Sequence, residues 1–334
     1  MISRILLAIF MFVSSTTLSL SKECGKVTIA DMNWGSATLI ANVDKLILEK
    51  GYGCDVDLIL GDTVPTFTSM KDKGAPDVAP ELWASTVSTL LTQAEEQGKL
   101  NVLNSSPITG LGEGWFVTPG TLQRHPHLKT VQDVIDNPQL FPHPEDPSKG
   151  AFVTCPYGWG CQKSNLNLFR AFDMEAKGWR LLDPGSSAGL DGTIAKASVR
   201  NQNWFGFYWT PTALAGKYNM VMLDWGIEYA GDDNWDNCIV KSVHECLEPK
   251  ATAWTTPVVS TVVTQNFLDT ASIESINYIQ NRVWSTDILN KHLASMESKQ
   301  LDGRMAAMSF LQKQIDVWKE WVNDEAYQKI IRSL

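Results

Sequence analysis

The sequence of 334 residues is poor in charge and in long apolar runs. Only 19% of its residues are charged, acidic residues outnumber basic ones by 37 to 28, and no stretch gathers Lys and Arg into a cluster. A surface of net negative charge repels polyanions, so we expect no nucleic-acid partner. After residue 21 no apolar run is long enough to span a bilayer, which argues against a transmembrane protein.

Metal ligands are also scarce. The chain has five histidines, and no two of its six cysteines have the C-x-x-C spacing that is typical of zinc sites. His125 and His127 flank a proline, but no third ligand accompanies them, and we interpret them as solvated. We therefore predict no metal and no cofactor.

Residues 1–21 have the three parts of a secretion signal. A short positive start ends at Arg4, an apolar run covers residues 5–13, and small residues at 19 and 21 form a cleavage site. We expect cleavage near Ser21 and export to the periplasm.

The cysteines of an exported chain usually form disulfides when their number is even. Two pairs each bracket a short segment, and the third pair lies beside two predicted strands. A metal site is the alternative interpretation. The favoured pairs are Cys24–Cys54, Cys155–Cys161 and Cys238–Cys246.

Strands and helices alternate along most of the chain, which predicts an α/β fold with helices on mostly parallel sheets. The first strand is expected at 26–31, and the helix at 37–50 after it is expected to end at Gly51. A turn-rich stretch over 119–150 interrupts the alternation. We therefore predict two lobes, each a mixed, mostly parallel sheet flanked by helices. Lobe 1 begins with 22–116, lobe 2 covers 117–225, and 226–334 returns to lobe 1 with C-terminal helices.

Tryptophan, in contrast, is abundant, with thirteen residues. Some, such as Trp318 and Trp321, follow helical spacing and are assigned to packing. Others stand beside glycine, proline or other turn residues, where a core does not need them. Ring faces gathered at turns attract a weakly hydrated cation, above all a quaternary ammonium. The tryptophans at turns are Trp34, Trp83, Trp115, Trp159 and Trp209.

Three motifs resemble the glycine betaine and proline betaine-binding proteins of ABC importers. They are Cys-Pro-Tyr-Gly-Trp-Gly-Cys at 155–161, Tyr-Trp-Thr-Pro at 208–211 and Pro-Val-Val-Ser-Thr at 257–261. Asp-Met-Asn-Trp at 31–34, together with Trp83 and Trp115, is similar to the choline-binding branch of the same superfamily. The resemblance covers essentially all of 24–334 and implies a two-lobed periplasmic binding fold of type II that closes on its ligand.

The resemblance also implies roles for particular residues. The trimethylammonium group would lie in a box formed by Trp34, Trp83, Trp159 and Trp209, and Trp115 matches a box tyrosine of the choline branch. The backbone N–H groups of Gly160 and Cys161 would hold a ligand carboxylate, which is consistent with a helix expected near Ser164. The chain departs from the family pattern at Val87, where relatives have a histidine.

Two side chains leave alternatives open. Glu81 near the box either contacts the cationic head of a ligand or serves only as a helix cap or surface partner. Ser187 lies in a Gly-x-Ser-x-Gly motif, which allows a serine hydrolase with His244 or His292 as the base.

The function that we predict is that of a periplasmic solute receptor without catalytic turnover. Its ligand would be glycine betaine or a related methylated onium compound, with choline, dimethylsulfoniopropionate and trimethylamine N-oxide as alternatives. Its macromolecular partner would be an inner-membrane ABC permease, and we expect a monomer.

Overall fold

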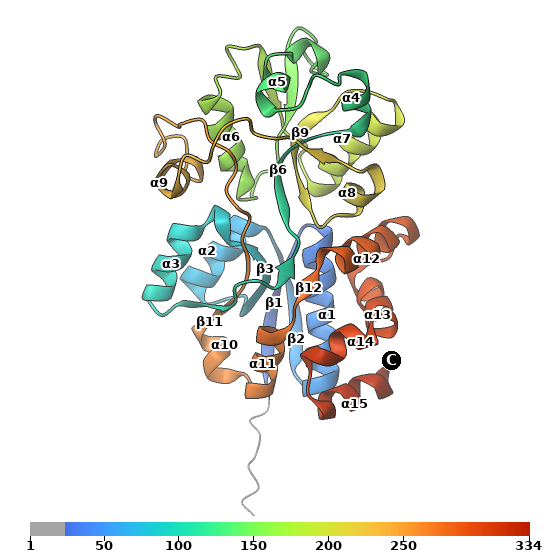
Figure 1. Ribbon diagram of the computed structural model, residues 1–334. Helices are drawn as coiled ribbons and strands as arrows, with labels where there is room; N and C mark the ends of the chain where they lie inside the picture. The colour runs from blue at the N-terminus through green and yellow to red at the C-terminus, as the bar shows by residue number, and fades with distance from the viewer. Residues whose placement is uncertain (1–23) are drawn as a thin grey trace, which may run out of the picture.

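The computed structural model describes residues 24–334, which form two lobes, each built on a five-stranded sheet with helices packed around it (Figure 1). The predicted secretion signal, residues 1–21, lies outside the described residues. In the described part of the chain, no helix combines the length and the apolar character needed to cross a membrane.

Lobe 1 is built on a mixed sheet in which β1 pairs in parallel with β2 and β3, whereas β11 pairs antiparallel with β3 and β4. The strand order is β2 (Asp55–Gly61), β1 (Lys26–Met32), β3 (Val78–Trp83), β11 (Val259–Thr264) and β4 (Leu100–Asn104). A two-stranded ribbon joins β5 (Ile108–Thr109) to β12 (Trp284–Ser285).

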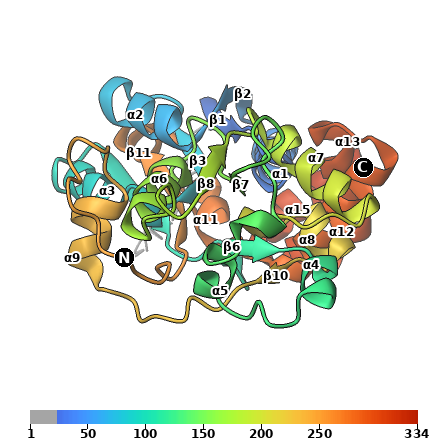
Figure 2. The same cartoon turned by 90° about the horizontal axis from the view of Figure 1, so that it is seen from above.

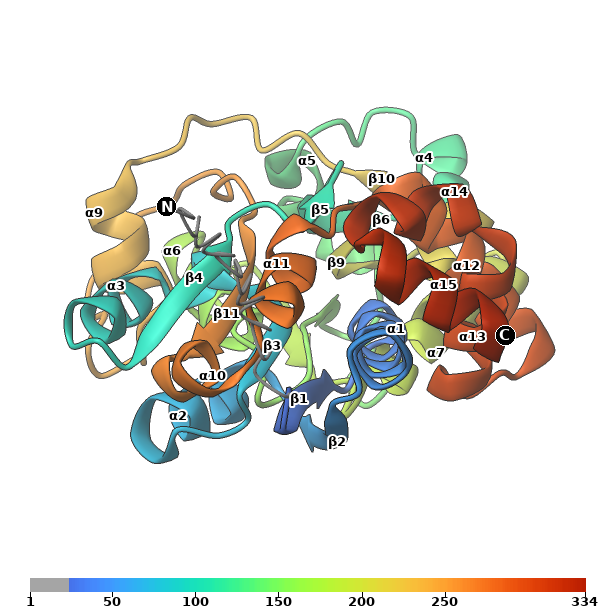
Figure 3. The ribbon, with the colours of Figure 1, turned by 90° about the horizontal axis from the view of Figure 1, so that it is seen from below.

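The helices of lobe 1 come from both ends of the chain. They are α1 (Gly35–Tyr52), α2 (Thr63–Lys73), α3 (Ser88–Glu96), α10 (Gln265–Thr270), α11 (Ile273–Asn281), α12 (Thr286–Lys299), α13 (Gly303–Lys313), α14 (Ile315–Trp318) and α15 (Asp324–Ser333), with 3₁₀ turns η1 (Ala84–Thr86) and η4 (Lys319–Trp321). Figure 3 shows α13 and α15 beside α1, against which both pack.

Helix α1 ends at Tyr52 and is capped by Gly53, whereas the sequence had suggested that Gly51 ends it. Gly53 adopts the left-handed conformation (φ 72°) that closes the helix, which glycine tolerates best. Gly51 instead faces α15, where a Cβ would approach that of Ala326 to 3.1 Å. It therefore serves close helix packing.

Lobe 2 is built on a second mixed sheet, with two parallel and two antiparallel pairings, as in lobe 1. The strand order is β10 (Val221–Met222), β6 (Gly112–Val117), β9 (Phe205–Thr210), β7 (Gly150–Val153) and β8 (Trp179–Leu182). Its helices are α4 (Pro119–Arg124), α5 (Val131–Ile135), η2 (Pro138–Leu140), α6 (Cys161–Ala171), α7 (Ser187–Val199) and α8 (Ala213–Tyr218). The predicted fold class is confirmed, although parallel pairs do not predominate in either sheet.

The predicted lobe boundary after residue 116 is wrong. Strand β6 belongs to lobe 2, where Gly112 pairs with Thr210 and Val117 with Phe205 of β9. The chain therefore crosses between the lobes before Gly112. The glycine-rich start of β6 conceals the strand in the sequence, because glycine is depleted in strands.

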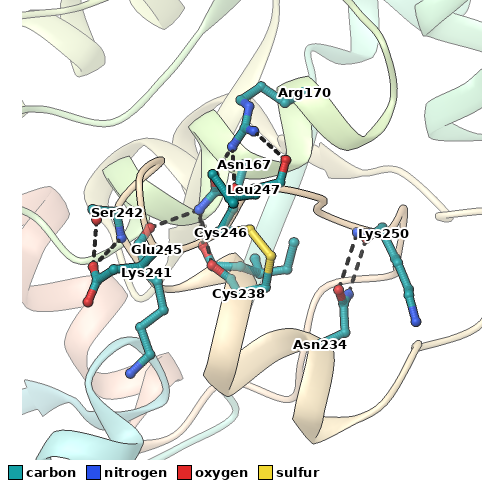
Figure 4. The surroundings of a disulfide bond; sticks show 11 residues. Asn167, Arg170, Asn234, Cys238, Lys241, Ser242, Glu245, Cys246, Leu247 and Lys250 are labelled. Carbon is teal, nitrogen blue, oxygen red and sulfur yellow. Dashed lines mark hydrogen bonds between the residues drawn. A yellow bond between two sulfur atoms is a disulfide. The ribbon is translucent and has the colours of Figure 1, made fainter.

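The predicted return to lobe 1 at residue 226 is also wrong, because the segment that follows is anchored on α6 of lobe 2. Asn167 donates to the carbonyl groups of Cys238, Ile239 and Lys241, and Arg170 donates to those of Cys246 and Leu247, as Figure 4 shows in part.

The same segment also touches lobe 1. It contains α9 (Asp232–Asn234) and the π-helical η3 (Trp235–Ile239), and α9 lies at the edge of the molecule near α3 and α6 (Figure 2). The indole of Trp235 donates to the carbonyl oxygen of Ser85 at 3.3 Å, and Ser88 donates to Asp236. The segment over 231–250 therefore bridges the two lobes.

Disulfides join all six cysteines in the three favoured pairs, Cys24–Cys54, Cys155–Cys161 and Cys238–Cys246. The first connects the start of β1 to the start of β2 in lobe 1. The second closes the loop before α6, and the third closes the bridging segment shown in Figure 4.

Candidate ligand-binding site

A narrow cavity lies between the lobes, and aromatic rings form most of its wall. The space inside it that the centre of a water molecule can reach is small, about 20 Å³. Trp34, Thr63 and Trp83 line it from lobe 1. Lobe 2 contributes the other lining residues, which are Glu113, Trp159, Gly160, Cys161, Phe207 and Trp209.

Trp159 is the central ring of this cavity. It meets Trp34 edge to face at 5.4 Å between ring centroids and meets Trp209 in the same manner at 5.0 Å. Its indole Nε1 donates to Oδ1 of Asn33 at 2.7 Å, across the lobe interface. The ring therefore connects both lobes at the cavity.

The elements explain why these rings meet. Trp34 follows β1 and is the N-cap residue of α1, and Trp83 is the last residue of β3. Ligands of open α/β sheets bind beyond the carboxyl ends of the strands, and β1 and β3 are parallel neighbours that both end here. Trp209 lies near the end of β9, so lobe 2 presents its ring to the same cavity.

Glu81 is fully buried behind two of the rings, and it does not line the cavity. Its Oε1 accepts hydrogen bonds from Nε1 of Trp34 at 2.8 Å, from Oγ of Ser36 at 2.9 Å and from Nε1 of Trp83 at 3.2 Å. Burial raises the pKa of Glu81 to about 7, against the opposing effect of these bonds. Neither role expected from the sequence describes Glu81, because the side chain lies neither at the surface nor in the cavity wall and instead holds two tryptophans in place.

Glu113 was not anticipated from the sequence. It lies on β6, lines the cavity from lobe 2 and is 6% exposed. Oε2 accepts a hydrogen bond from Nε1 of Trp254 at 3.1 Å, and burial raises the pKa of this carboxyl to about 7. The sequence offers one signal, a carboxylate between two glycines and just before Trp115. This signal can be interpreted only when residues 112–117 are known to form a strand.

The loop before α6 presents backbone donors to the cavity. Helix α6 begins at Cys161, earlier than expected, and no side chain caps its N-terminus. The amide N–H groups of Gly160 and Cys161 donate to no other described residue. Gly160 also packs so closely on Thr86 of lobe 1 that a Cβ at this position would overlap the threonine.

Trp115 does not belong to this site, and the prediction that it joins the other four rings is wrong. The side chain is fully buried inside lobe 2, where it packs on Phe152, Phe205 and Trp225. Its Nε1 donates to Oδ1 of Asn165 at 2.9 Å. Alternate residues of a strand share a face, so Trp115 and Glu113 lie on the same face of β6. Glu113 reaches the cavity, whereas Trp115 lies in the interior of lobe 2.

Trp254 lies outside the cavity wall and supports it from behind. It packs on Phe207 at 5.6 Å between ring centroids and donates to Glu113. Trp318 and Trp321 lie in lobe 1 away from the cavity: Trp318 is fully buried, and Trp321 packs on Trp284.

The hydrolase alternative gains no support from the contacts of Ser187. This residue begins α7, and its neighbour Ser186 caps the helix by accepting from the N–H of Gly189 at 3.0 Å. Within residues 24–334 no hydrogen bond joins Ser187 to His244 or His292. His292 lies on α12 of lobe 1 and packs on Phe310.

The sequence matches one protein-family model, described as the substrate-binding domain of ABC-type glycine betaine transport systems, over residues 25–313. No curated protein matches the chain significantly.

Solved structures share the fold at low sequence identity. An ABC-transporter choline-binding protein in complex with choline has a TM-score of 0.71 at 16% identity, over 93% of this chain and 98% of that chain. A glycine betaine/L-proline-binding protein, ProX from Borrelia burgdorferi, has a TM-score of 0.71 at 16% identity, over 91% and 99%. Lactococcal OpuAC, closed on glycine betaine, has a TM-score of 0.66 at 15% identity, over 90% and 100%. At these identities the likeness establishes the fold alone.

Proposed function

The chain belongs to the substrate-binding family of ABC-type glycine betaine transport systems, and from this premise we propose that it is an exported receptor for a methylated onium solute. It binds the solute between its lobes and presents it to a membrane permease. Glycine betaine is the leading ligand, and choline, dimethylsulfoniopropionate and trimethylamine N-oxide are the alternatives.

The observation that carries this proposal is the convergence of four tryptophans, from both lobes, on one cavity. A trimethylammonium group has no N–H donor, so a binding site recognises it through ring faces and diffuse negative charge. Each desolvated ring contact contributes about 0.5–2 kcal/mol, and several rings together give useful affinity. Rings that come from both lobes also make binding depend on closure.

Two contacts of the cavity connect ligand binding to closure. Trp159 bonds to Asn33 across the interface, and Gly160 packs directly on Thr86. Rings and backbone from both lobes enclose the cavity, so the lobes separate to admit the ligand. Closure then removes the ligand from water and strengthens its electrostatic contacts.

The polar end of the ligand would lie near two backbone N–H donors and near the carboxyl group of Glu113. The free N–H groups of Gly160 and Cys161 suit a carboxylate, because helix N-termini favour anions. Glu113 favours a ligand carboxylate or an N-oxide only when it is protonated and able to donate. An ionised Glu113 instead suits choline, whose charge it balances and whose hydroxyl it accepts.

The pKa of about 7 for Glu113 therefore gives each ligand class its own pH dependence. As pH rises through 7, Glu113 ionises, so choline affinity is expected to rise relative to betaine affinity. Titration calorimetry with a panel of glycine betaine, choline, dimethylsulfoniopropionate and trimethylamine N-oxide at pH 6 and pH 8 tests both points. Absence of heat with every onium compound would contradict the proposed function.

A further inference from the structure

The hydrogen bonds of Glu81 concentrate on one oxygen. Oε1 accepts from the indoles of Trp34 and Trp83 and from the hydroxyl of Ser36, whereas the buried Oε2 has no partner among the described residues. A carboxyl that only accepts matches the ionised form, because a protonated acid needs an acceptor for its own O–H.

We propose that Glu81 is a positioning and specificity residue. Because of Glu81, the tryptophan cavity selects a ligand by its positive charge and not only by its shape. The carboxylate does not touch the ligand. It fixes two indoles and increases the negative charge of the ring faces that they turn toward the cavity. This inference rests on the proposed function of the same cavity.

The chemistry follows from how an indole carries charge. The N–H bond donates to a carboxylate, and a charge-assisted hydrogen bond of this kind polarises the donor. The polarised ring holds more electron density on its face, which is the part that attracts a cation. The buried charge also acts on the ligand directly, through a medium of low dielectric constant.

The other charged groups near Glu81 are paired with each other or lie in the other lobe, so Glu81 is the carboxylate that acts on the two indoles. Arg282 is the cation whose charge reaches Glu81, but Arg282 is fully buried in an ion pair with Asp44, with 2.8 Å between Nε and Oδ1. Tyr278 donates to the same Asp44 at 2.7 Å. Glu113 is the acidic group that faces the cavity from the other lobe. A bound onium group therefore stabilises the ionised form of Glu81.

The test compares onium ligands with isosteres that lack the positive nitrogen, in the Glu81→Gln protein. Glutamine keeps an oxygen that accepts from both indoles and replaces the unpartnered oxygen by an NH2 group, so it removes the charge with almost no change of shape. The ligand pairs are glycine betaine with 3,3-dimethylbutanoate and choline with 3,3-dimethylbutan-1-ol, in which a carbon replaces the quaternary nitrogen. We expect the Kd of the onium ligand to rise on the order of tenfold or more, and that of the isostere to change less than about threefold.

Asp191→Asn is the matched control. Asp191 is a partly buried carboxyl of raised pKa, but it accepts from the hydroxyl of Tyr208 and contacts neither Glu81 nor its indoles by hydrogen bonds. Its removal is expected to leave the ratio of onium to isostere affinity unchanged.

A second measurement requires no isostere and no change at Glu81. The ¹⁵N-labelled indole N–H signals of Trp34 and Trp83 are followed with pH in the Glu113→Gln protein, where Glu81 is the carboxyl that titrates beside them. We expect a midpoint near 7 that falls when an onium ligand is added, because the cation favours the carboxylate.

The outcomes separate the two proposals. If the wild-type protein binds no onium ligand, the proposed function fails and this inference with it. If it binds onium ligands but Glu81→Gln weakens onium and isostere equally, or the indole midpoint does not move with ligand, the inference alone is overturned.

Discussion

Replacing Trp159 by alanine removes the ring on which the cavity is centred. The variant loses the ring face offered to the onium group, the edge-to-face contacts with Trp34 and Trp209, and the bond from Nε1 to Asn33 across the lobes. Both the binding surface and the closed arrangement of the lobes depend on this side chain.

The loss can be estimated from these parts. One desolvated ring contact contributes about 0.5–2 kcal/mol, and a hydrogen bond contributes about 0.5–1.5 kcal/mol. The two parts together give an expected loss of about 1–3.5 kcal/mol, which raises Kd roughly 5- to 400-fold. Trp159→Phe keeps a ring but no N–H, and we expect it to raise Kd only about tenfold.

Titration calorimetry with the tightest onium ligand measures these changes, and a thermal melt of each variant shows that the fold is retained. An alanine variant that binds within about threefold of the wild-type protein would refute the reasoning, because Trp159 would then contribute no ring contact. An equal loss in Trp159→Phe would place the effect in the hydrogen bond and not in the ring.

Three further predictions concern closure, the assignment of rings and pH. Gly160→Ala is expected to weaken ligand binding about tenfold or more, because its Cβ overlaps Thr86, and Thr86→Gly in the same protein should restore part of the affinity in calorimetry. Trp115→Phe should lower the thermal midpoint and leave Kd unchanged, whereas a weakened Kd would return this ring to the site. Glu113→Gln should remove the difference between the choline and glycine betaine pH profiles between pH 6 and pH 8, leaving a shared rise of affinity with pH that comes from Glu81, and a retained difference would assign it to another group.

The sequence predicted the general plan of the molecule because that plan depends on local patterns. Alternation of strands and helices indicated two α/β lobes, and glycine or proline within three residues of Trp34, Trp83, Trp159 and Trp209 indicated rings near turns. Residues after parallel strands meet at one edge of a sheet, so local pattern and topology agree at these positions.

Features that depend on long-range register could not be predicted. The segment 112–117 contains two glycines and does not resemble a strand, so the pairing of β6 with β9 was missed. Without that pairing, neither the burial of Trp115 in lobe 2 nor the position of Glu113 at the cavity can be predicted from the sequence. The bonds from Trp34 and Ser36 to Glu81 span 47 and 45 residues, a separation at which the sequence offers no pattern.

The central claim is that the four tryptophans enclose an onium group between the lobes. A crystal structure of the protein with glycine betaine, or with whichever onium ligand binds most tightly, tests this claim most directly. We predict the methyl groups in contact with the ring faces of Trp34, Trp83, Trp159 and Trp209, with the lobes closed around them. A ligand bound elsewhere, or bound between the lobes without contact to these rings, would contradict the account.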